Sequence, residues 1–140
     1  MQSHSFWGFM LLIFTASGCS SQPSTDKFVQ EMKTVTSWAA TSQMVGDAWL
    51  KQDVPTVYAK LTLETAQEKL QKEAETLNKV TPFQQKTRVL NQLQQLEKTV
   101  TRMAIAVNNK DNPAVSQQVQ ILSTHQQALH SLIKETGGQP

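Results

Sequence analysis

Apolar residues recur at intervals of three and four along most of the chain after residue 25. This spacing places them on one face of an α-helix, because an α-helix has about 3.6 residues per turn. The first such stripe comprises Phe28, Met32, Val35, Trp38, Val45 and Trp49. Comparable stripes follow in three later stretches. The pattern predicts four helices, at approximately 26–50, 54–78, 82–109 and 113–135.

Three prolines, Pro55, Pro82 and Pro113, fall close to the predicted starts of the last three helices. Proline is tolerated in the first helical turn because the N–H that it lacks would have no partner inside the helix there. Apart from its first turn, none of the four stretches contains proline. The prolines therefore separate the predicted helices.

Polar residues beside these prolines suggest how the helix ends are capped. Asp53 is placed to cap the second helix, and Thr81 with Gln84 matches a capping box for the third. Asn112 directly precedes Pro113 and is expected to be the N-cap of the fourth. Gly137–Gly138 is expected to end that helix.

No stretch shows the alternating pattern of a β-strand. Four amphipathic helices of similar length, joined by short loops, predict an all-α fold: an antiparallel up-down-up-down four-helix bundle over residues 26–136. The alternative is a pair of long helical hairpins that complete a bundle by dimerising.

The second predicted helix has apolar residues on two faces. Val57 and Leu61 point away from the main stripe, which either a bend or an apolar patch facing something outside the bundle would explain. The main stripe comprises Leu63, Ala66, Leu70, Ala74 and Leu77.

The chain begins with a short apolar leader. The uninterrupted apolar run covers the nine residues 6–14, whereas a membrane-spanning helix needs about 20. A run of this length followed by small residues is typical of a secretory signal peptide. Residues 1–18 are therefore expected to be removed.

Residues 16–19, Ala-Ser-Gly-Cys, resemble the bacterial lipoprotein box, in which small residues precede a cysteine that is acylated. Ala16 stands where the family prefers Leu, and the leader holds no Lys or Arg. The resemblance implies that Cys19 carries the lipid and becomes the first residue of the mature protein. The alternatives are an ordinary signal peptide with an incidental cysteine, and an uncleaved amino-terminal anchor. Residues 19–25 are then the lipidated cysteine and a polar tether. Ser20 after the cysteine implies the outer membrane, facing the periplasm, if the organism has two membranes.

Composition narrows the choice of partners. Thirteen Lys and Arg against eleven Asp and Glu leave a net charge of +2, without the basic stripe that nucleic-acid binding requires. Cys19 is the only cysteine, so an intramolecular disulfide is excluded. The expected contacts are the membrane, through the lipid, and a protein of the cell envelope.

Few residues are suited to catalysis or to metal binding. The mature chain has no Cys–His pair, no Gly-x-Ser-x-Gly turn and no glycine-rich phosphate loop. His125 and His130 are five residues apart, about 140° around a helix, so they cannot share one metal ion. We therefore expect no enzymatic activity and no resident cofactor.

Two ligand hypotheses remain. Met32 on the first helix and His125 on the fourth could ligate a non-covalent haem, although both residue types more often only pack in a core. Trp38 and Trp49 share one stripe and, with Tyr58, could line a groove for an apolar ligand or a partner. Tryptophans of a helical bundle more often only fill its core.

These observations favour a non-enzymatic, lipid-anchored envelope protein that acts as a helical interaction or accessory module. A bundle that binds a small ligand or cofactor is the first alternative. A dimeric helical spacer is the second.

Overall fold

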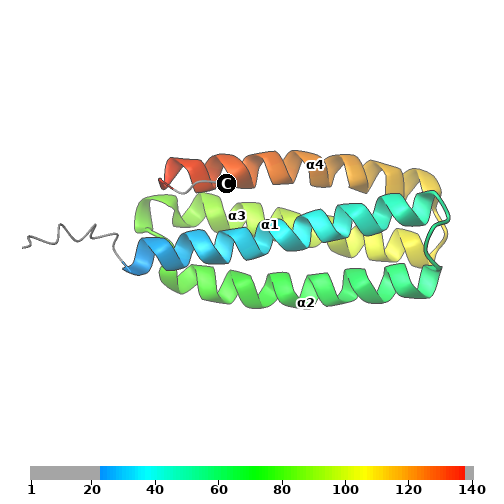
Figure 1. Cartoon of the computed structure of the whole chain (residues 1–140), viewed down its shortest axis with the longest axis horizontal. Helices are drawn as coiled ribbons and strands as arrows, with labels where there is room; N and C mark the ends of the chain where they lie inside the picture. Colours follow the sequence, from blue (N-terminus) through cyan, green and yellow to red (C-terminus); the bar gives the residue numbers. More distant parts are fainter. Residues whose placement is uncertain (1–22, 138–140) are drawn as a thin grey trace, which may run out of the picture.

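The computed structural model describes residues 23–137, which form four α-helices. The helices are α1 (Pro23–Leu50), α2 (Thr56–Val80), α3 (Phe83–Asn108) and α4 (Asn112–Glu135). Each helix runs antiparallel to the next along the chain (Figure 1). The predicted all-α four-helix bundle is confirmed, and a single copy of the chain completes it.

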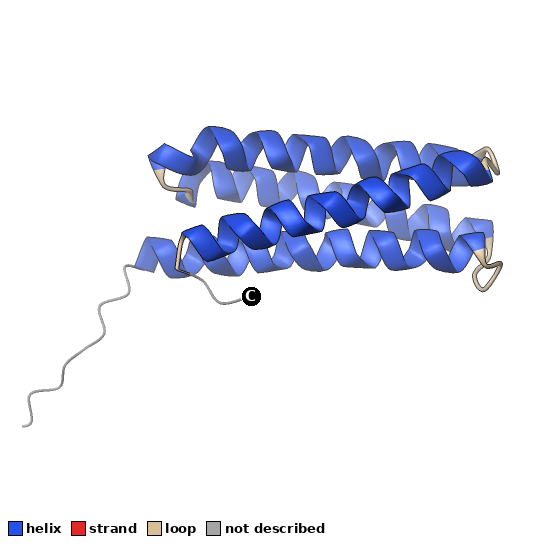
Figure 2. Cartoon of the chain, turned by 90° about the horizontal axis from the view of Figure 1, so that it is seen from above, coloured by secondary structure: helices blue, strands red, loops and turns tan. Residues whose placement is uncertain are grey.

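The helices are arranged as a four-membered ring in cross-section. α1 packs against α2 and α4, and α3 packs against the same two helices (Figures 1 and 2). α1 also touches α3 across the diagonal. Within residues 23–137, no helix is long and apolar enough to cross a membrane.

The short connections define two ends of the bundle. We call one the Pro23 end: it holds the start of α1, the turn at residues 81–82, the start of α3 and the end of α4. The far end holds the turns at 51–55 and 109–111. Both far-end turns contain a residue with positive φ that is not glycine, Gln52 at 62° and Lys110 at 54°.

The predicted helix ends need correction. Pro55 and Pro82 are themselves the N-caps of α2 and α3, and neither helix has a side-chain cap hydrogen bond. Thr81 ends α2 instead of starting α3, because its backbone N–H and its hydroxyl both donate to the carbonyl of Leu77. The capping roles predicted for Asp53 and for the Thr81–Gln84 pair were wrong.

The start of α4 is shifted by one residue from the prediction. Asp111 is the N-cap, and its Oδ1 accepts a hydrogen bond of 3.1 Å from the N–H of Ala114. Asn112, the predicted cap, is the first residue of the helix. At the other end Gly137 has a φ of +82° and donates to the carbonyl of Lys134 at 3.1 Å, as a terminating glycine does.

The apolar stripes meet in one core. Most residues of the predicted stripes are buried, whereas Trp38, Ala74 and Leu90 pack against the core from partly exposed positions. The largest fully buried side chains are Phe28, Met32, Leu63, Leu70, Leu77, Leu96, Met103, Leu122, Leu129 and Ile133.

At Gly46, α1 lies close to both α3 and α4. A Cβ atom at this position would lie 2.8 Å from Met103 Sδ on α3 and 2.8 Å from Val119 Cγ2 on α4. Real Cβ contacts are longer than this. The absence of a side chain at Gly46 therefore lets three helices meet at one point.

Candidate functional site

The structure separates the residues proposed for haem binding and for a ligand groove. Met32 is fully buried in the core, and Trp49 is only 8% exposed. Trp38 packs at the edge of the core from a partly exposed position. Tyr58 is 54% exposed on α2. These side chains do not line a common cavity among those found in residues 23–137.

Trp49 closes the turn between α1 and α2. Its Nε1–H donates a 3.0 Å hydrogen bond to Oγ1 of Thr56, the first residue of α2. The indole ring thus buries its apolar body while its polar edge finds a partner, as buried tryptophans usually do.

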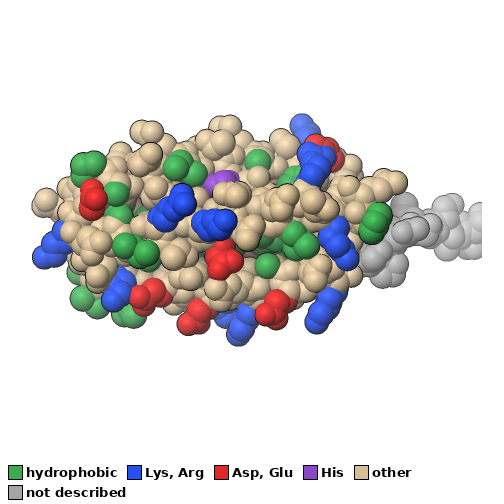
Figure 3. All heavy atoms as spheres, turned by 180° about the vertical axis from the view of Figure 1, so that it is seen from behind, with side chains coloured by type: hydrophobic (Ala, Val, Ile, Leu, Met, Phe, Trp, Pro, Cys, Tyr) green, Lys and Arg blue, Asp and Glu red, His purple; other side chains and the backbone are tan. Residues whose placement is uncertain are grey.

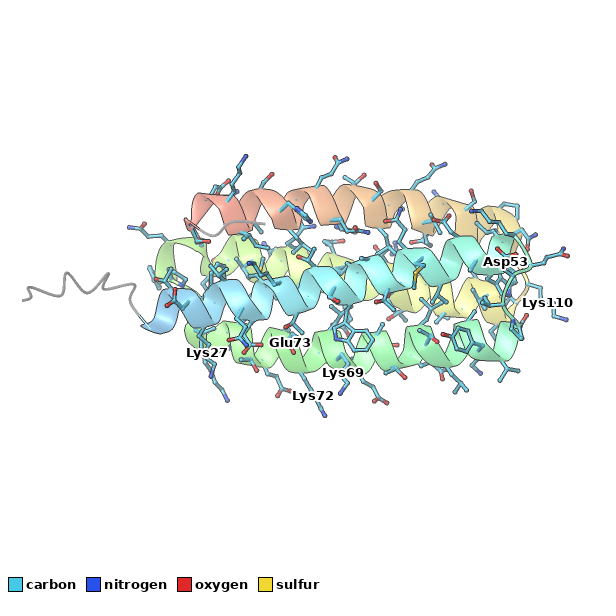
Figure 4. All side chains as sticks on the ribbon, viewed as in Figure 1. Lys27, Asp53, Lys69, Lys72, Glu73 and Lys110 are labelled. Atoms are coloured by element: carbon cyan, nitrogen blue, oxygen red, sulfur yellow. The ribbon has the colours of Figure 1, made fainter. Side chains whose placement is uncertain are left out.

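A shallow depression of about 570 Å³ lies beside Trp49 at the far end. The two far-end turns line it, and they include Asp53 and Lys110, which Figure 4 labels. The depression is open to solvent and holds no cluster of charges of one sign. Polar side chains make up much of its lining, and the charged residues among them are Asp53 and Lys110.

His125 bridges α4 and α3 from a half-buried position. Its Nδ1 lies 2.6 Å from Gln92 Nε2, and its Nε2 lies 3.1 Å from Thr99 Oγ1. Thr99 uses its own proton to donate to the carbonyl of Gln95 at 2.9 Å. The Thr99 oxygen must therefore accept from His125, which requires a proton on Nε2.

The bonding of His125 fits a neutral imidazole. With the proton on Nε2, Nδ1 keeps its lone pair and accepts from the Gln92 amide. Burial lowers the pKa of His125 below its ordinary value of 6.5, because desolvation disfavours the charged ring. Both ring nitrogens are occupied within the protein, so neither is aimed at an axial position of a haem.

A pair of carboxyl groups that was not predicted from the sequence lies between α1 and α2. The carboxyl groups of Glu73 and Glu31 are close enough to interact, and Oε2 of Glu73 is buried without a hydrogen-bond partner. Burial and the interaction with Glu31 together raise the pKa of Glu73 to about 7, against the opposing charge of Lys69. Figure 4 places Glu73 in the seam between the two helices.

The spacing of Glu73 could have indicated this environment. It lies three residues after Leu70 and four before Leu77, both of which are buried, so it sits at the edge of the apolar stripe. Glu64, by contrast, is half-exposed and forms a 3.8 Å pair with Lys60. Such surface pairs contribute only tenths of a kcal/mol.

Within residues 23–137, no group of three or more His, Cys, Asp or Glu residues is arranged to hold a metal ion.

Large apolar side chains are exposed at both ends of the bundle. Val57, Tyr58 and Leu61 form a far-end cluster on α2, with 70%, 54% and 57% of their surfaces exposed. Their exposure explains the second apolar face of this helix, since α2 runs unbroken from Thr56 to Val80. Figure 3 shows apolar side chains at the end of the bundle away from the grey residues. At the Pro23 end, Phe83 is 91% exposed.

The proposed lipidation site, Cys19, lies outside the described residues, as does the predicted signal peptide. α1 begins at Pro23, three residues earlier than predicted and inside the expected tether. Only three residues separate Cys19 from the first residue of α1.

Comparison of the chain with protein-family models, with curated proteins and with solved structures finds no match.

Proposed function

We propose that this protein is a non-enzymatic lipoprotein of the bacterial envelope, whose helical bundle is held at a membrane by Cys19 and serves as an interaction module. The observation that carries the proposal is the position of the lipoprotein-box cysteine, which directly precedes a folded bundle. The leader before it has the length of a signal-peptide core.

The short connection between Cys19 and Pro23 supports anchoring at the bilayer. Four Cα–Cα steps of 3.8 Å span at most about 15 Å. Each buried acyl CH₂ contributes about 0.8 kcal/mol, and two or more chains give stable anchoring. A lipid on Cys19 would therefore keep the Pro23 end of the bundle close to the membrane surface.

The far-end cluster supports the interaction role. Val57, Tyr58 and Leu61 occupy the part of α2 that a lipid on Cys19 would hold farthest from the bilayer. α1 is 28 residues long, which corresponds to about 42 Å as a helix. The cluster would thus face the aqueous side, where an envelope protein could reach it.

Metabolic labelling with palmitate tests the anchoring. Wild-type protein is expected to incorporate the label and to remain with membranes, and Cys19→Ser is expected to do neither. Ser20→Ala serves as the matched control, because it changes a neighbouring small residue and keeps the cysteine. Equal labelling of Cys19→Ser and wild type would refute the proposal.

A further inference from the structure

Phe83 is the most exposed large apolar side chain of the described residues. It is the first residue of α3, directly after the turn at 81–82, and 91% of its surface is accessible. At 100° per residue, Phe83 falls outside the apolar stripe of α3, which passes through Val89, Leu93 and Leu96. Burying a phenylalanine side chain is favourable, so leaving it in water forgoes a sizeable stabilisation.

Phe83 lies at the Pro23 end. The Glu31–Glu73 contact joins the first half of α1 to the last half of α2, and the Arg88–Glu135 ion pair, at 2.9 Å, joins the start of α3 to the end of α4. These contacts place the turn at 81–82 at the level where α1 begins. Figure 1 shows the same arrangement, with the start of α1 beside the end of α2 and the start of α3.

The lysines at this end suit an anionic lipid surface. Lys79 lies in the last turn of α2, Lys134 in the last turn of α4 and Lys86 in the first turn of α3. The acidic residues of these turns and of the first turn of α1 are Asp26 and Glu135, and Glu135 is already paired with Arg88. Basic side chains close to an anionic bilayer are attracted to its negative surface potential.

We propose that Phe83 inserts into the membrane interface and, with Lys79 and Lys86 of the two adjoining helix turns, docks the Pro23 end of the bundle against the bilayer. This inference rests on the proposed lipidation of Cys19. Cys19 and Pro23 can be at most about 15 Å apart. A lipid on Cys19 would therefore hold the Pro23 end, and Phe83 with it, close to the bilayer, so we infer that Phe83 meets lipid. The lipid supplies affinity, and Phe83 sets the orientation, so that the far-end cluster points away from the membrane.

The test places an environment-sensitive fluorophore on Phe83→Cys in the mature lipoprotein. Acylated Cys19 has no free thiol, so the introduced cysteine is the only labelling site. Tyr58→Cys is the matched control, since Tyr58 is an exposed aromatic residue at the far end. The proteins are reconstituted in vesicles of phosphatidylethanolamine and phosphatidylglycerol that contain a brominated lipid as quencher. Circular dichroism verifies that both variants remain helical.

On vesicles, the label at position 83 is expected to shift its emission to shorter wavelength and to be quenched by the brominated lipid. The label at position 58 is expected to show neither effect. If the protein is acylated and bound to vesicles while the label at 83 behaves like the label at 58, the docking inference is wrong and the lipoprotein proposal stands. If mass spectrometry finds no acyl chain on Cys19, both proposals fail.

Discussion

Oγ1 of Thr99 on α3 lies 3.1 Å from Nε2 of His125 on α4 and, by donating its own proton to Gln95, fixes the imidazole as the Nε2–H tautomer. Thr99 is 4% exposed, and the contact with His125 lies in a half-buried seam. A donor left without an acceptor in such a position costs about 1–3 kcal/mol. The contact therefore stabilises the packing of α3 on α4.

Thr99→Val should lower the free energy of unfolding by about 1–2 kcal/mol, because it keeps the shape of the side chain and removes the acceptor for His125. Thr101→Val is the matched control: Thr101 also lies on α3 and donates to the carbonyl four residues before it, but it does not contact a histidine. Urea unfolding followed by circular dichroism measures both variants. An equal loss in the two would contradict the role of the His125 contact.

His125 should titrate at a lower pH than an exposed histidine, because burial lowers its pKa. Because the pKa of His125 is lowered in the folded protein, the unfolded chain binds the proton first as the pH falls. Its contribution to stability is therefore present above the ordinary value of 6.5 and is lost as the pH drops below it. NMR titration of the ring is expected to give a midpoint below 6.5. A midpoint at or above that value would contradict the neutral bridging role.

Glu73 should make the bundle less stable as the pH rises from about 4.5 to about 7, because its pKa is raised to about 7 in the folded protein. In that window the folded state binds the proton more tightly than the unfolded chain does. Above pH 7 both states have lost the proton, and the destabilising effect is complete. Solvent screening at the helix edge reduces the effect to on the order of 1 kcal/mol.

Glu73→Gln removes this dependence, so the variant should gain about 1 kcal/mol over wild type between pH 5 and pH 8. Glu75→Gln is the control, since Glu75 is exposed on the same helix. Thermal unfolding at the two pH values gives the comparison. A difference between Glu73→Gln and wild type that does not change with pH would show that the carboxyl pair does not titrate as described.

Gly46→Ala should destabilise the bundle by up to about 2 kcal/mol, although alanine is the better helix former. The helical preference of alanine over glycine favours the variant by about 1 kcal/mol. The new Cβ would lie 2.8 Å from Met103 Sδ and 2.8 Å from Val119 Cγ2, and overpacking of this kind costs about 1–3 kcal/mol.

The reverse substitution at an exposed position of α1, Ala40→Gly, measures the helical preference alone. Combining Gly46→Ala with Val119→Ala removes one of the two clashing groups, so the double variant should lose less than the sum of the single losses. If Gly46→Ala stabilises the protein by the full helical preference, the expected clash of the new Cβ with Met103 and Val119 does not occur.

Thr56→Val should cost about 1 kcal/mol, because it leaves the indole N–H of Trp49 without its acceptor at the first turn of α2. Thr65→Val is the control on the same helix, since the exposed Thr65 hydroxyl contacts only the carbonyl of Leu61. Chemical denaturation is again the measurement. Equal stabilities of the two variants would show that the Trp49–Thr56 hydrogen bond does not stabilise the turn between α1 and α2.

The helices were predictable because their apolar residues repeat with the helical period and because Pro55, Pro82 and Pro113 separate them. The caps were less predictable. Thr81 lies in the two-residue turn between the end of α2 and the start of α3. Its hydroxyl donates to a carbonyl at the end of α2 and does not cap α3. A polar side chain between two helices can serve either one, and only the path of the backbone decides between them.

The candidate surfaces were predicted in part. The second apolar face of α2 indicated that Val57 and Leu61 either mark a bend or face outward, and the structure shows them exposed on a continuous helix. The pairing of Glu31 with Glu73 was missed, since the two residues are far apart in sequence and meet only when α1 packs on α2. The residues predicted to bind a ligand do not line one cavity in the structure: Met32, Trp38, Trp49, Tyr58 and His125.

The sequence by itself determined four amphipathic helices and their approximate ends, and it predicts a leader whose cysteine resembles a lipidation site. Those features are local, because periodicity, proline and the apolar run act within a few turns of the chain. The tertiary structure decided the surroundings of residues at the edges of the stripes: His125 bonds α3, Glu73 meets Glu31, and Phe83 remains in solvent at the Pro23 end. Helical period defines which face is apolar, but the neighbouring helix determines whether a residue at the border of that face meets a partner or water.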